Sequence, residues 1–88
     1  SIAPLNEAQS VQRVAILFED EHYARIVAMA PSLRDTASRY RLAYAYYAVG
    51  DFAVATDRAR ALLKTPYKEA AAALLQAMGR GHGESREQ

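Results

Sequence analysis

Apolar residues recur at helical spacing along most of the chain, and short breaks divide the pattern into five stretches. The first stretch begins at Asn6, where Gln9 follows three positions later as in a capping box, and it continues to about Glu19. Its apolar side consists of Val11, Val14, Ala15, Leu17 and Phe18. A shorter helix is predicted over residues 22–30, and it ends before Pro31 because the residue preceding a proline disfavours the α conformation.

The middle of the chain predicts two further helices with a tight turn between them. Asp35 or Thr36 caps the third helix, which reaches about Val49. Gly50 follows as a residue that adopts positive φ at low cost, so we expect it to end this helix. The fourth helix is predicted over residues 51–64.

A fifth helix closes the pattern. Thr65 is its expected cap, and Pro66 occupies the favoured first-turn position. Its apolar residues are followed by Gly79, where we expect the helix to end. The remaining segment is rich in glycine and charge, so we predict one helical domain over residues 1–79 and a flexible tail over residues 80–88.

Composition supports an all-α fold of one small domain. Alanine is frequent, glycine and proline are sparse, and the chain has 88 residues. Short connections make about five antiparallel helices neighbours, either as a compact bundle or as a short right-handed solenoid. Cysteine is absent, which removes disulfides and thiol chemistry but leaves the compartment open between cytoplasm and periplasm. No apolar run approaches the roughly 18 residues of a transmembrane helix, so no membrane partner is expected.

One stretch, residues 40–66, combines a helix, a glycine-containing turn, a second helix and a closing proline. The residues that carry the pattern are Leu42, Ala43, Tyr46, Gly50, Asp51, Phe52, Ala55, Ala61, Leu62 and Pro66. With one residue missing between Ala55 and Ala61, this stretch resembles a tetratricopeptide repeat. It departs from that family at Arg39, where a tryptophan is common, and residues 6–31 resemble a second, more divergent repeat.

The resemblance implies a tetratricopeptide-like (TPR-like) solenoid in which helical hairpins stack and the fifth helix acts as a capping helix. It further implies a non-catalytic protein–protein interaction module, such as a scaffold, an adaptor or a small chaperone. The resemblance also implies a concave groove, where proteins of this family bind a peptide or a helix of a partner protein.

Three tyrosines mark the expected binding site. Tyr40, Tyr44 and Tyr47 recur at a spacing of four and three residues, which places them on one side of the third helix. Tyrosine combines a large apolar ring with a polar tip, so we expect these residues to anchor a partner, with Arg41 giving charge selectivity. The alternative is that the first helix covers this side and that the tyrosines belong to the core.

Other functions find less support in the sequence. The second candidate function is self-assembly, in which the nearly all-apolar fifth helix pairs two chains as a homo-oligomer. Arginine interleaved with tyrosine is also typical of nucleic-acid binding, but the net charge of +1 argues against that partner. No catalytic residue, cofactor or metal site is expected, because neither His22 nor His82 has a partner at a chemically useful spacing.

Overall fold

The computed structural model describes residues 5–87, with side chains described up to Gly79. Within this range the protein is all-helical, with five α-helices, one 3-10 turn and no strand. The elements are α1 (Glu7–Glu19), α2 (Tyr23–Ala28), the 3-10 turn η1 (Ala30–Ser32), α3 (Thr36–Ala48), α4 (Phe52–Ala61) and α5 (Lys68–Glu87). The predicted fold class, all-α with about five helices, is therefore confirmed.

Side-chain caps fix the starts of α1 and α3. The Gln9 N–H donates to the Asn6 side chain at 2.8 Å, and the Asn6 N–H donates to the Gln9 side chain at 3.0 Å. This reciprocal pair is the predicted capping box. The Ser38 N–H donates to the Asp35 carboxylate at 2.9 Å, so Asp35 rather than Thr36 caps α3.

The turn between α3 and α4 has the predicted glycine. Gly50 lies at φ +91°, a conformation that other residues adopt only with strain. The Gly50 N–H donates to the Tyr47 carbonyl and the Asp51 N–H donates to the Tyr46 carbonyl, so these two carbonyls in the last turn of α3 are satisfied. Asp51 then caps α4 through a longer bond of 3.4 Å to the Val54 N–H.

Several predicted boundaries were wrong. The second helix ends at Ala28, and Pro31 lies inside η1, because a 3-10 turn accepts proline near its start. The fourth helix ends at Ala61 and not at residue 64. The fifth begins at Lys68, after a turn in which the Thr65 hydroxyl donates to the Leu62 carbonyl at 2.6 Å.

The end of α5 also differs from the expectation. We placed it near Gly79, but the helix continues to Glu87. Glycine lowers helix propensity by about 1 kcal/mol without forbidding the conformation, so a glycine alone does not end a helix. The flexibility of residues 80–88, and with it the division into domain and tail, stays a prediction.

α3 is the central element, because it packs against α1, α2, α4 and α5. Two buried clusters lie on either side of it. One comprises Val14, Ile26, Leu33, Leu42 and Ala45, and the other comprises Ala43, Ala55, Ala59, Leu62, Ala71, Leu74 and Met78. Tyr46 packs against both clusters. Leu42 packs inward, since none of its surface is exposed.

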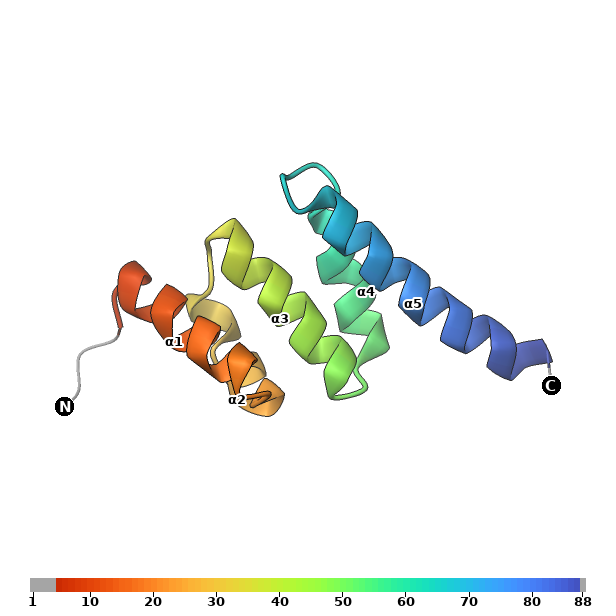
Figure 1. Ribbon diagram of the computed structural model, residues 1–88, viewed down its shortest axis with the longest axis horizontal. Coiled ribbons are helices and arrows are strands. Elements are labelled where there is room, and N and C mark those ends of the chain that lie inside the picture. Colours follow the sequence, from red (N-terminus) through yellow and green to blue (C-terminus); the bar gives the residue numbers. More distant parts are fainter. Residues whose placement is uncertain (1–4, 88) are drawn as a thin grey trace.

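The molecule is elongated in the direction in which the helices follow one another. Its extents are 52 × 25 × 19 Å and its radius of gyration is 13.8 Å, against about 12 Å for a compact domain of this length. Figure 1 shows α1, α3 and α5 in one layer, with α2 and α4 behind them. α1 and α2 therefore form one end of the molecule and α5 forms the other (Figure 1).

Candidate partner-binding surface

α3 brings its three predicted anchor tyrosines together along one side. The ring centroids of Tyr40 and Tyr44 lie 6.5 Å apart, and those of Tyr44 and Tyr47 lie 5.6 Å apart. Because residues three and four apart share a helix face, the row follows directly from the sequence. Rings from other elements contact this row at both of its ends and at Tyr44 in its middle.

Rings from the other elements extend this row into one continuous set. Tyr44 contacts Phe18 of α1 at 5.4 Å and Tyr23 of α2 at 5.7 Å. At one end Tyr40 stacks on Tyr67, and at the other Tyr47 stacks on Phe52, each pair at 5.6 Å. We call the set the aromatic cluster: Phe18, Tyr23, Tyr40, Tyr44, Tyr47, Phe52 and Tyr67. It includes every aromatic residue of the chain except Tyr46.

Every member of the aromatic cluster is partly exposed. The rings therefore do not form a closed core, and they do not stand free in solvent either. α1 and α2 cover the inner edge of Tyr44 through Phe18 and Tyr23, while part of its surface stays open. The cluster is therefore not fully covered, as the core alternative expects, and it is not fully exposed either.

A hollow lies where α1, α3 and the start of α5 approach one another. It has a volume of about 380 Å³ and is lined by Ala15, Phe18, Glu19, Ala37, Tyr40, Arg41 and Tyr67. The guanidinium of Arg41 lies 5.9 Å from the centroid of the Phe18 ring, within the range of a cation–π contact. Glu19 lines the same hollow, so the positive charge of Arg41 is accompanied by a carboxylate.

Burial and neighbouring phenols change the acidity of this surface. Burial disfavours the charged phenolate of Tyr40, and the adjacent Tyr44 adds to the effect, so the pKa of Tyr40 is raised above 10.0. The pKa of Tyr23 is raised as well, by burial first and then by Tyr44 and Glu21. At neutral pH both rings therefore carry hydroxyl groups that can donate a hydrogen bond.

The sequence did not identify the partner rings of the tyrosine row. Phe18 was assigned to the apolar side of its helix, and Tyr67 was given no role. Their contacts join residues that are 26 and 27 positions apart in sequence, Phe18 with Tyr44 and Tyr40 with Tyr67. One feature of the sequence could have suggested the contact of Tyr67 with Tyr40. Tyr67 directly follows Pro66, so it lies just before the fifth helix, near the start of the third helix where Tyr40 lies.

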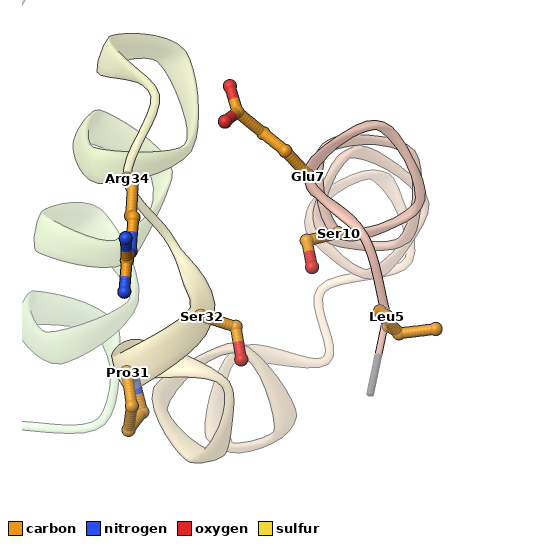
Figure 2. Close-up of a pocket in the computed structure, with 6 residues that line it drawn as sticks. All are labelled: Leu5, Glu7, Ser10, Pro31, Ser32 and Arg34. Carbon is orange, nitrogen blue, oxygen red and sulfur yellow. The ribbon is translucent and has the colours of Figure 1, made fainter. Parts of the chain in front are cut away.

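A second hollow, shown in Figure 2, lies between the first turn of α1 and the segment after α2. It measures about 300 Å³ and is lined by Leu5, Glu7, Ser10, Pro31, Ser32 and Arg34. The Ser10 hydroxyl is buried and has no hydrogen-bond partner. Ser38 is 28 residues further on, and its hydroxyl is equally buried and unpartnered, although Ser38 does not line this hollow. We therefore interpret both serines as small residues at helix contacts and not as ligand groups.

Neither a metal site nor a membrane span is present among the described residues. No group of three or more histidine, aspartate or glutamate side chains in this part of the chain is arranged so that it could hold a metal ion. None of the helices in the described range combines the length and the hydropathy that a bilayer span requires. Glu19, Asp20, Glu21 and His22 thus remain an exposed turn.

Comparison with known proteins identifies no relative. No family model matches the sequence, and neither a curated protein nor a solved structure gives a match. The resemblance to tetratricopeptide repeats therefore rests on the residues of this chain alone.

Proposed function

We propose that this chain is a TPR-like, non-catalytic protein–protein interaction module whose aromatic cluster binds a peptide or a helix of a partner protein. The observation that carries the proposal is the gathering of all aromatic rings except Tyr46 into one partly exposed surface. Partly exposed tyrosines and phenylalanines are the residues that most often dominate binding energy when a partner covers them.

The order of helix contacts supports the TPR-like part of the proposal. α3 packs against α1 and against α5, its counterparts two helices before and after, as well as against its neighbours α2 and α4. Contacts of this kind are expected when helical hairpins stack in a right-handed solenoid of antiparallel helices. In such an arrangement α1, α3 and α5 are the first helices of successive units, and the aromatic cluster follows the binding side of α3.

The hollow beside Tyr40 supports an anchor-type contact. Its volume of about 380 Å³ accommodates one large side chain of a partner, and its wall combines the rings of Tyr40 and Tyr67 with Arg41 and Glu19. A partner segment with an apolar anchor residue would pack against the two rings, and polar or charged groups beside that residue would pair with Arg41 and Glu19. Arg41 is proposed to give charge selectivity here, in a wall that also contains the carboxylate of Glu19.

Self-assembly through α5 is the second candidate function. Ala71, Leu74 and Met78 are buried in the fold, whereas Ala73 is exposed and Ala72, Leu75 and Ala77 are partly exposed. A second copy could cover this apolar remainder. It offers mostly methyl groups, and so less apolar area than the aromatic cluster.

Peptide selection tests the proposal. A random peptide library is panned against the wild-type chain, with counter-selection on Tyr40→Ala, which removes one wall of the hollow. Selected peptides are expected to bind the wild type with a Kd near or below roughly 10 μM and the variant at least about tenfold more weakly. Tyr46→Phe is the matched control, because Tyr46 lies outside the aromatic cluster.

The contrary outcomes are equally defined. Peptides that bind Tyr40→Ala as well as the wild type would place binding elsewhere. Failure to select any peptide, together with a concentration-dependent dimer that Ala73→Glu disrupts, would favour self-assembly through α5. Circular dichroism of each variant confirms that the helices are intact.

A further inference from the structure

A third surface, at the end of the molecule formed by α1 and α2, is open and apolar. We call it the outer groove; its volume is about 570 Å³ and its lining is Leu5, Arg13, Ile16, Leu17, Arg25, Ala28, Met29 and Ser32. Ile16 and Leu5 are 55% and 38% exposed, which places two of the three exposed large apolar side chains of the described residues in one groove. None of its lining residues belongs to the aromatic cluster.

α1 and α3 have matching side chains at an offset of 28 residues. The matching pairs are Ser10 with Ser38, Arg13 with Arg41, Val14 with Leu42, Ala15 with Ala43, and Phe18 with Tyr46. Val14 and Leu42 are both fully buried, so the correspondence holds in the packing as well as in the sequence. By this offset of 28, which aligns the buried sides of the two helices, Ile16 corresponds to Tyr44 and Leu17 to Ala45. The ends of the helices align one residue further on, since Glu7–Glu19 and Thr36–Ala48 are offset by 29.

The corresponding side of α3 is covered by two helices. Ala45 is fully buried in the cluster that includes Val14 of α1 and Ile26 of α2. Tyr44 contacts Phe18 and Tyr23, and the guanidinium of Arg41 lies over Phe18. Helices therefore cover this side of α3, whereas no helix of the described residues covers the corresponding side of α1.

The charges of the outer groove select among possible occupants. Among the described residues, Arg13 of α1 and Arg25 of α2 are the only charged residues that line it, and none of the lining side chains is acidic. A two-fold pairing of this face with a second copy would bring four arginines together, which costs energy unless carboxylates accompany them. A helix with carboxylates beside its apolar stripe complements both the apolar floor and the arginines.

We propose that the outer groove docks an amphipathic helix of a partner protein, with an apolar stripe seated on Ile16 and Leu17 and carboxylates paired with Arg13 and Arg25. This inference does not depend on the function proposed for the aromatic cluster. It adds a second binding surface, at the α1–α2 end of the molecule.

The test uses two designed peptides of about 15 residues, a length at which a helix-favouring sequence begins to fold. Both have leucine at every third or fourth position. The acidic peptide has glutamates beside the leucines, and the basic peptide has lysines there. Nuclear magnetic resonance titration of the chain with each peptide reports which amide signals shift and at what concentration.

The acidic peptide is expected to bind with a Kd below about 0.1 mM, to shift the signals of α1 and α2 around Ile16 and Arg25, and to bind more weakly as salt increases. The basic peptide is expected to bind at least about tenfold more weakly. Ile16→Glu should weaken acidic-peptide binding by a similar factor. Val49→Glu is the matched control, because Val49 is 48% exposed but lies away from the groove.

A charge exchange completes the test. The double variant Arg13→Glu and Arg25→Glu is expected to prefer the basic peptide, a reversal that a loss of fold cannot produce. The proposal is overturned if the two peptides bind equally, if the shifts map to the aromatic cluster, or if neither peptide binds at millimolar concentration. A dimer of the wild-type chain that Ile16→Glu abolishes would overturn it as well, because a second copy would then occupy the groove.

Discussion

Glu21 and Gly50 both have a positive φ just after the ends of α1 and α3. Glu21 ends α1 at φ +59°, and Gly50 ends α3 at φ +91°. The hydrogen bonds also correspond, because the His22 N–H donates to the Leu17 carbonyl at 2.8 Å and the Asp51 N–H donates to the Tyr46 carbonyl at 2.9 Å. The first turn therefore uses a glutamate in a conformation that favours glycine.

Replacing Glu21 by glycine should stabilise the protein. The left-handed conformation costs an L-residue about 1–2 kcal/mol, and part of this is returned by the larger entropy of glycine in the unfolded chain. We expect Glu21→Gly to raise the free energy of unfolding by about 0.5–1 kcal/mol in urea denaturation. Gly50→Ala should lower the free energy of unfolding by about 1 kcal/mol or more. If both substitutions changed this free energy in the same direction, the two turns would not have equivalent backbone requirements.

Tyr40 should ionise above the usual range for tyrosine. Its folded pKa is raised above 10.0 by burial and by Tyr44, so the folded state holds the phenol proton more tightly than the unfolded chain does. This contribution to stability is fully present below pH 10 and is lost as the pH rises through the folded pKa. Absorbance titration at alkaline pH should show late-ionising tyrosine signal that Tyr40→Phe diminishes.

Thermal melting across the same range provides the matching control. The melting temperature of the wild type should fall as the pH rises above 10, and Tyr40→Phe should fall less steeply because one of the ionising phenols is gone. Identical pH profiles for the two proteins would contradict a special role of Tyr40.

The two buried serines should be replaceable by alanine without loss. Neither the Ser10 nor the Ser38 hydroxyl has a hydrogen-bond partner, so each leaves water without compensation. Alanine also has the higher helix propensity. We expect Ser38→Ala to raise the free energy of unfolding by up to about 1 kcal/mol, and Ser38→Val to lower it because the site is fully buried.

Tyr44 should contribute to stability as well as to binding. Its ring contacts those of Phe18, Tyr23, Tyr40 and Tyr47. Tyr44→Ala is therefore expected to cost about 2–4 kcal/mol of unfolding free energy, in addition to any loss of peptide binding. Tyr44→Phe separates the two effects, since it keeps the ring and removes only the hydroxyl. A loss below 1 kcal/mol for Tyr44→Ala would contradict the described contacts.

The features that the sequence predicted correctly are local ones. The capping box of Asn6 and Gln9, the cap at Asp35 and the glycine turn at Gly50 each depend on residues within a few positions. The row of tyrosines on α3 is local in the same sense, because it requires only the period of one helix. These features would be read the same way in almost any tertiary context.

The features that could not be predicted from the sequence depend on tertiary contacts, or on a residue that adopts a locally unfavourable backbone conformation. Glu21 in a glycine conformation breaks a local rule, and nothing beside it in the sequence signals the exception. The rings of Phe18 and Tyr67 join the site only when α1 and the start of α5 pack beside α3. The outer groove likewise exists because Ile16 stays exposed in the fold, and the residue pattern of α1 alone does not predict this exposure.

The division of the core into two clusters on either side of α3 has an evolutionary consequence. Val14 and Ile26 depend on α3 and on each other, whereas Leu62 and Leu74 belong to the other cluster. We therefore expect a substitution confined to one cluster to change the packing of the other little, provided that α3 and Tyr46 are kept. Under the two binding proposals, each end of the molecule is then expected to change its surface independently, while the shared central helix keeps the fold.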